Sequence, residues 1–194
     1  SVIRAKIEEL KSEDRIGTMQ FFKCTLVMVE EVGGKDIPFS AITVEWLQKC
    51  EKLWSKTRSV STIGMHMRNI RTLMNEAKRA GVIKESQYPF GKGLFEIKTG
   101  IGRKKGLTKK QLKAIFDYKS GNETTNRYKD LWIFIYLCNG INPTDMLKLK
   151  FSDIVDGEIC FVRQKTERTT KNRKEIRATI SVQTQAVIDK WGNK

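Results

Sequence analysis

The sequence predicts a mainly α-helical protein of the α+β class, in which a helical bundle precedes a mixed α/β part with a small antiparallel sheet. Three observations carry this prediction. Apolar residues recur at spacings of three and four through most of the first half. Two runs near the end have the composition of strands, and apolar and polar residues alternate along the second of them. A glycine-rich stretch separates the helical pattern from the later elements.

The helices of the first half follow from this periodicity and from their end signals. We expect helices over residues 1–11, 17–32 and 59–80, and a further helix that begins after Thr43 as its N-cap. The pattern is clearest in the third range, because five apolar residues form one stripe along it. The stripe consists of Ile63, Met67, Ile70, Met74 and Ala77.

A change of texture after this helix predicts a domain boundary. Helical periodicity is lost between residues 83 and 106, where we expect only a short strand near residues 94–97. From Lys98 to Lys113 there are seven basic residues and no acidic one. We therefore expect a helical domain over residues 1–97, a basic linker over 98–106 and a second domain over 107–194.

The second domain is expected to combine helices with a hairpin. Thr108 caps a predicted helix, and residues 128–138 are apolar on all sides, which predicts a buried central helix. Strands are predicted over residues 158–165 and 173–180, and Ser181 should cap a final helix.

Net charge gives the first indication of function. The chain carries a formal charge of +15 and has a pI near 9.8, which favours a polyanionic partner, most simply nucleic acid. No apolar run approaches the roughly 20 residues that span a bilayer, and the charged start is not a secretory signal. We expect a cytoplasmic protein that does not bind membranes.

Basic residues concentrate in three places: the polar face of the helix over 59–80, the linker, and the predicted hairpin. Such side chains, with small polar neighbours, can contact phosphates and base edges of double-stranded DNA. A solvated helix face would explain any one of them alone, whereas three together suggest a clamp around DNA. The candidate DNA-binding residues are Ser61, Arg68, Thr72, Asn75, Arg79, Arg103, Lys104, Lys105, Arg163 and Arg173.

Metal and cofactor chemistry find no support in the sequence. The four cysteines form no Cys-x-x-Cys pair and lie in apolar contexts, so we expect reduced, buried thiols. His66 is the single histidine, and we expect it to be partly buried or in incidental contact with DNA. No metal site and no cofactor are predicted.

The stretch "CNGINPTDMLKLK" at residues 138–150 follows the apolar run and restarts a helix. Asn142 suits the N-cap, Pro143 the first helical position and Asp145 the third, where a carboxylate favours the helix dipole. Helix capping alone is enough to explain these residue types.

The order of these elements resembles the tyrosine recombinase (phage integrase) family over nearly the whole chain. Two motifs carry the likeness. "GINPTDMLKLKFSDI" resembles the family's Gly-x-Arg-x-x-Glu/Asp-Leu-x-x-Leu motif, and "GEICFVRQKT" resembles the strand that bears the family's catalytic lysine. The resemblance implies a core-binding domain followed by the first part of a catalytic domain.

The resemblance also implies a chemistry. In that family a tyrosine attacks a DNA phosphodiester and forms a 3′-phosphotyrosyl link, while cations stabilise the charge on the phosphate. By this likeness Lys165 is the candidate general acid, Asp145 supports the site, and Asn142 stands where the first catalytic arginine is usual. Either another arginine replaces it, or the position is a plain N-cap.

A further departure concerns the rest of the site. The family's His-x-x-Arg motif and nucleophilic tyrosine follow the lysine hairpin, and the four tyrosines of this chain all precede it. We therefore expect a truncated recombinase fragment, from a mobile element, that binds DNA beside other recombinase protomers and cleaves nothing. The alternative is a non-catalytic DNA-binding regulator built on a recombinase scaffold. An RNA-binding module has no stacking motif to support it.

Overall fold

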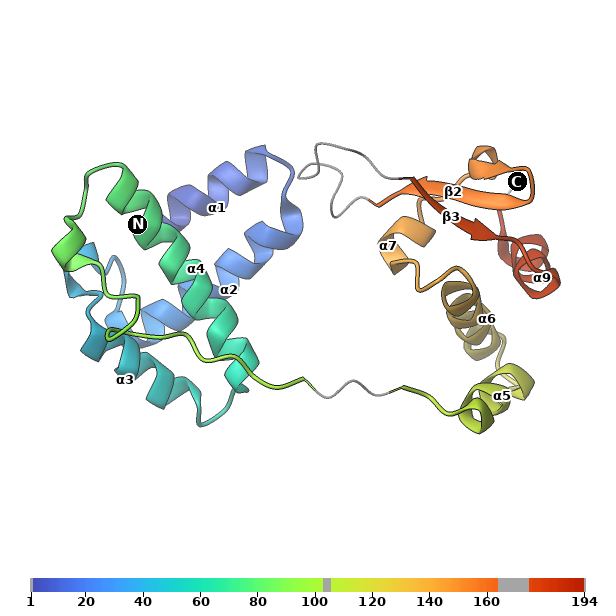
Figure 1. Cartoon of the computed structure of the whole chain (residues 1–194), viewed down its shortest axis with the longest axis horizontal. Helices are drawn as coiled ribbons and strands as arrows, with labels where there is room; N and C mark the ends of the chain where they lie inside the picture. Colours follow the sequence, from blue (N-terminus) through green and yellow to red (C-terminus); the bar gives the residue numbers. More distant parts are fainter. Residues whose placement is uncertain (1, 103–105, 164–174, 194) are drawn as a thin grey trace. The chain divides into compact units, whose positions relative to one another are not determined.

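The computed structural model describes residues 2–102, 106–163 and 175–193 (Figure 1). The chain divides into two compact units, Ser1–Lys104 and Lys105–Lys194, which are described separately. The architecture is mainly helical with a small antiparallel sheet, and the predicted fold class is confirmed.

The first unit is a helical bundle. Its helices are α1 (Val2–Ser12), α2 (Ile16–Gly33), α3 (Val44–Trp54) and α4 (Val60–Arg79), with short 3-10 helices at Phe39–Ala41 and Glu85–Gln87. α1 packs on α2, and α4 packs on both α2 and α3 (Figure 1).

The ends of these helices follow local side-chain chemistry. Thr43 caps α3, where its hydroxyl accepts a hydrogen bond from the Trp46 amide, and Ser59 caps α4 by accepting from the Thr62 amide. Each cap satisfies one of the backbone donors that a helix start leaves open.

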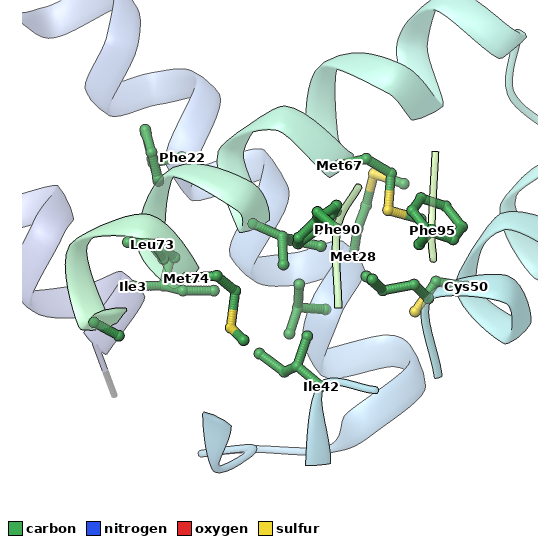
Figure 2. Packing of buried hydrophobic residues seen from close by; sticks show 14 of the residues in the cluster. Ile3, Phe22, Met28, Ile42, Cys50, Met67, Leu73, Met74, Phe90 and Phe95 are labelled. Carbon is green, nitrogen blue, oxygen red and sulfur yellow. The ribbon is translucent and has the colours of Figure 1, made fainter. Parts of the chain in front are cut away.

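The predicted apolar stripe of α4 is the centre of the first core. All five of its members are buried, among side chains from α1, α2, α3 and the segment around Phe90 and Phe95 (Figure 2). Burying one such side chain contributes about 1.5–3 kcal/mol, so the stripe fixes which face of α4 points outward.

The predicted strand over residues 94–97 is wrong. One isolated bridge joins Phe90 and Phe95, whose rings meet edge to face at 5.9 Å. Gly91 and Gly93, with φ of 147° and 79°, turn the chain sharply between them. The segment thus folds back on its own start, and no strand among the described residues lies beside it to extend the pairing.

The second unit combines helices with a three-stranded sheet. It contains α5 (Lys109–Asp117), α6 (Glu123–Leu137), the short α7 (Pro143–Met146), a 3-10 helix at Phe151–Asp153 and α9 (Val182–Trp191). The strands β1 (Ile154–Val155), β2 (Glu158–Val162) and β3 (Glu175–Thr179) pair antiparallel in that order. β2 and β3 lie within the two predicted strands and pair antiparallel, but both are shorter than the predicted ranges 158–165 and 173–180. Residues 164–174, which include the predicted connection, lie outside the described residues. β1 was not predicted.

Local signals again set the element ends. Thr108 and Gln111 form the predicted capping box at the start of α5, and Ser181 caps α9. Opposite β2, Ala178 is buried and its neighbours Arg177 and Thr179 are exposed, as the alternation in β3 predicts.

The expectation that the central helix is buried on all sides is wrong for the described residues. Within α6 only Ile133 and Phe134 are buried, while Tyr128 is 68% and Tyr136 47% exposed. Among the described elements, α6 makes its main contacts with α9 and α5. An apolar sequence shows that a helix can be buried, but it does not show how many neighbouring elements cover the helix.

Candidate nucleic-acid interface

The outward face of α4 brings together five of the predicted DNA-binding residues. Steps of seven, four, three and four residues return to nearly the same side of a helix with 3.6 residues per turn. Three of the five are exposed and two are half-buried at the edge of the face. The five are Ser61, Arg68, Thr72, Asn75 and Arg79.

This face carries uncompensated positive charge. Arg71 and Arg79 are exposed and form no ion pair with any acid in the described part of the chain. The one acidic residue of α4, Glu76, pairs instead with Lys6 of α1 at 2.8 Å. Guanidinium groups that are free of protein partners are available to phosphate oxygens.

A second basic row lies on α3 and in the turn that follows it. Lys49, Lys52 and Lys56 are exposed, and their spacing of three and four residues places them on one side. None of the three pairs with an acid among the residues that the structure describes. Since α3 packs on α4, the two basic rows belong to adjoining elements of one compact unit.

The start of the predicted basic linker lies against α4. Lys98 Nζ is 2.8 Å from Glu51 Oε2 of α3, and Arg68 Nη2 donates to Thr99 Oγ1 at 3.4 Å. Arg68, expected to contact DNA, is therefore engaged with the linker, and the open part of the face runs from Thr72 to Arg79.

His66 lies on the opposite, buried side of α4. Its exposed fraction is 4%, so the expectation of partial burial or incidental DNA contact is wrong. The imidazole stacks on Phe21 of α2 at 4.8 Å and meets Trp54 of α3 edge to face at 6.4 Å. The ring was assigned to the edge of the apolar stripe, but α2 and α3 both close over it.

A polar network surrounds the ring. Thr25 Oγ1 lies 2.8 Å from His66 Nδ1, accepts from Asn69 Nδ2 at 2.8 Å and donates to the Phe21 carbonyl at 3.0 Å. A hydroxyl has one proton to donate and two lone pairs to accept with. All the groups are satisfied when the imidazole proton is on Nδ1 and donates to Thr25. Burial, helped by the charge of Arg58, lowers the pKa of His66, which favours this neutral form.

In the second unit, Asn142 is the N-cap of α7, as predicted. Its Oδ1 accepts a hydrogen bond from the Thr144 amide at 2.9 Å, and Pro143 occupies the first helical turn. Asp145 is buried in that turn. The side-chain oxygen of Asn142 is thus used by the backbone, and the amide nitrogen is the atom left to meet a ligand.

Of the remaining predicted residues, Arg163 is exposed just after β2. The other candidates, which lie outside the described residues, are Lys165, Arg173, Arg103, Lys104 and Lys105.

The described residues bear on the expectations for thiols, metals and membranes. The expectation of buried thiols is wrong for two of the four cysteines, because Cys24 is exposed and Cys160 is half-buried. No group of three potential metal ligands occurs among residues 2–102, 106–163 and 175–193. Burial raises the pKa of Cys50 to about 12 and that of Cys138 to about 11, so both thiols stay protonated near neutral pH. In the same ranges, no helix has the length and hydrophobicity that crossing a bilayer requires.

Comparison with known proteins agrees with this architecture. The family description "Phage integrase SAM-like domain" matches residues 1–97, which correspond to the helical first unit. No curated protein matches the sequence. The chain belongs to the phage integrase family.

Two solved structures share the fold at low identity. Both are the Tn1549 transposon integrase in complex with circular intermediate DNA, one of them an arginine-to-lysine variant. The variant aligns with a TM-score of 0.67 and the other with 0.59, each at 13% identity and over 100% of this chain. This chain spans 66% of the length of either relative.

Part of the basic surface was not predicted from the sequence. Arg71 and the three lysines of the α3 row were not singled out, although spacings of three and four residues in the sequence would have indicated the row. The partners of Arg68 and Lys98 have no comparable sequence signal, because Glu51 and Thr99 lie far from them along the chain.

Proposed function

We propose that this chain is the DNA-binding fragment of a site-specific tyrosine recombinase, with the polar face of α4 as its contact with duplex DNA. The observation that carries the proposal is a pair of exposed arginines on α4, Arg71 and Arg79, which form no ion pair with the described acids and lie next to Thr72 and Asn75. Membership of the phage integrase family and the fold shared with an integrase solved on DNA support it.

The geometry suits a binding mode that starts with phosphates. Arginine and lysine on α4 and α3 contribute affinity that does not depend on sequence, and amide or hydroxyl groups such as Asn75 and Thr72 add contacts to bases or phosphates. Because the polar network at His66 holds α4 on α2, this face is presented without rearrangement of the bundle.

For catalysis, the proposal concerns only the roles that individual residues would have. In a complete recombinase of this type, Lys165 would act as general acid and Asp145 would support the site. Asn142 would offer an amide donor to the phosphate in place of a charged guanidinium, which weakens stabilisation of the transition state. We expect this chain to form no covalent adduct with DNA.

Binding to duplex DNA across a salt series tests the proposal. The observed affinity should fall linearly with salt on logarithmic axes, with a slope of about −0.9 for each phosphate that the protein neutralises. A random duplex and a candidate recombination site should be compared. The absence of binding at low salt would refute the proposal.

A non-catalytic DNA-binding regulator is the second candidate, and the position of Asn142 favours it. Its side chain already serves as an N-cap, so the residue has a structural role that needs no DNA chemistry. Nicked duplexes that trap phosphotyrosyl intermediates separate the two candidates. They should be incubated with the protein that the native reading frame encodes. An adduct on a denaturing gel identifies a recombinase, and binding without an adduct identifies a regulator.

A further inference from the structure

Gly64 sits in the middle of α4, where glycine is an unfavourable choice. In a helix interior glycine is clearly less stabilising than alanine, because it has more backbone freedom to lose. It is also buried, on a helix whose other buried positions, apart from Ala77, are filled by large side chains. A position of this kind indicates a close approach by another part of the chain.

That approach is made by the backbone at residue 98. A methyl group built at Gly64 would lie 2.8 Å from the Lys98 carbonyl oxygen and 3.5 Å from Ile97 Cγ2. Gly100 passes α4 one turn earlier, where a methyl group would lie 2.3 Å from Ser61 Oγ and 3.3 Å from the Ser61 backbone nitrogen. Residues 97–100, hereafter the strap, therefore cross α4 in direct backbone contact with the helix.

Side chains hold the strap at both sides of this crossing. Lys98 pairs with Glu51 of α3 at 2.8 Å, and Arg68 of α4 donates to Thr99 at 3.4 Å. Just before the strap, Phe95 is buried in the first core, and Ile97 packs against that core. The strap is thus anchored at its start and then guided along the outward face of α4.

We propose that Gly64, Glu51 and Arg68 are positioning residues that seat the strap on α4 and so fix how the chain leaves the DNA-binding face. This inference rests on the proposed function. The seated strap keeps the charge of Lys98 beside the helix and leaves the open half of the face, from Thr72 to Arg79, free for a duplex. An unseated strap would have to be ordered during binding, which opposes it by the conformational entropy of each residue.

The decisive variant is Gly64→Ala in the full chain. The added methyl group meets a backbone oxygen that cannot rotate away, so the strap must shift, while α4 itself gains helix propensity. Gly17→Ala is the matched control, because Gly17 is also helical and a methyl group there meets nothing within 4 Å. Both variants should fold, which circular dichroism verifies.

The first readout does not depend on DNA. Trypsin cleavage after Lys98, followed by mass spectrometry, should be at least about fivefold faster in Gly64→Ala than in the parent, because cleavage tracks the population of the opened segment. Gly17→Ala should match the parent. Equal cleavage rates in all three proteins would overturn the inference that Gly64 holds the strap on α4.

The second readout is affinity for a random duplex at low salt. Gly64→Ala should bind at least about tenfold more weakly, which corresponds to about 1.4 kcal/mol. Glu51→Gln, which removes one exposed ion pair, should weaken binding by about twofold or less. Faster cleavage with unchanged affinity would overturn the positioning role. If the parent binds no DNA, the proposed function fails and the positioning role with it, while the cleavage rates still decide whether the seat exists.

Discussion

The Nδ1 atom of His66 lies 2.8 Å from the Oγ1 atom of Thr25, and this contact joins the DNA-facing helix α4 to α2. Thr25 is fully buried and also accepts from Asn69 of α4. One hydroxyl thus serves two donors from the helix that carries the proposed interface. The orientation of the proposed interface therefore depends on a buried contact on the opposite side of α4.

Thr25→Val should destabilise the first unit by about 2–4 kcal/mol. Valine keeps the shape of threonine but leaves the buried imidazole of His66 and the half-buried amide of Asn69 without their partner. A buried unsatisfied group costs about 1–3 kcal/mol, and the half-buried amide adds less because water can reach it. Urea unfolding with an unchanged m-value measures the loss. Thr18→Val, on the same helix and only half-buried, should change stability by less than about 0.5 kcal/mol. Equal effects of the two substitutions would contradict the role of the network.

Acid should destabilise the first unit through His66. Its pKa is lowered in the folded state by burial and by Arg58, from an ordinary value of 6.5. The contribution of neutral His66 is therefore complete above the unfolded-state value, and it is lost as the pH falls from there toward the folded-state pKa. The slope in that window is at most about 1.4 kcal/mol per pH unit.

The same pH series on His66→Gln isolates this effect. Glutamine cannot titrate, so the difference in stability between parent and variant should shrink as the pH is lowered below 6.5. A difference that stays constant from pH 7.5 to 5.5 would show that His66 does not gain a proton on unfolding.

Local chemistry made the helix ends predictable. The caps Thr43, Ser59, Thr108 and Ser181 each accept a hydrogen bond from an amide three residues on, so the signal lies within four residues of sequence. The apolar stripe of α4 was equally predictable, because its period alone decides which side faces the core.

Contacts between distant segments were not predictable in this way. The approach of Lys98 to Gly64 joins residues 34 positions apart, and no periodic pattern marks it. The prediction that α6 is buried on all sides failed for a related reason. The sequence shows that Tyr128 and Tyr136 can be buried, but it does not show whether another element packs on them. The position of the candidate site could therefore be determined only from the folded structure.

Arg79→Gln should weaken DNA binding and flatten its salt dependence. If Arg79 neutralises one phosphate, its loss should reduce the magnitude of the logarithmic salt slope by about 0.9. Lys92→Gln removes an equal charge from an exposed turn that is not part of α3 or α4, and should leave the slope unchanged within error. Equal slopes for the two variants would mean that binding depends on net charge rather than on the α4 face.

Asp130 should hold α9 on α6. Its Oδ2 accepts from Lys190 Nζ and from Trp191 Nε1, each at 2.9 Å. Burial raises the pKa of Asp130, but the hydrogen bonds from Trp191, Lys190 and Lys129 outweigh this and leave the pKa below its ordinary value. The contribution is present above the unfolded-state pKa and is lost as the pH falls through the folded-state pKa. Asp130→Ala should release Trp191 from this contact. In a background in which the other tryptophans are replaced, the fluorescence emission of Trp191 should then shift to the red. Asp156→Ala is the control and should leave that emission unchanged.

Asn142 allows capping and charge to be separated by two substitutions. Asn142→Asp keeps an acceptor oxygen for the Thr144 amide and adds a carboxylate at a helix start, so α7 should stay as stable as in the parent. Asn142→Arg loses the cap, at a cost of about 1 kcal/mol, but offers a guanidinium to phosphate. Hydrogen exchange at the Met146 and Leu147 amides, which close the first turns of α7, should therefore accelerate in the arginine variant alone. DNA affinity should change in the opposite sense, rising for arginine and falling for aspartate, if α7 approaches a phosphate. If both variants bind DNA as the parent does, Asn142 acts as a helix cap and has no part in the interface.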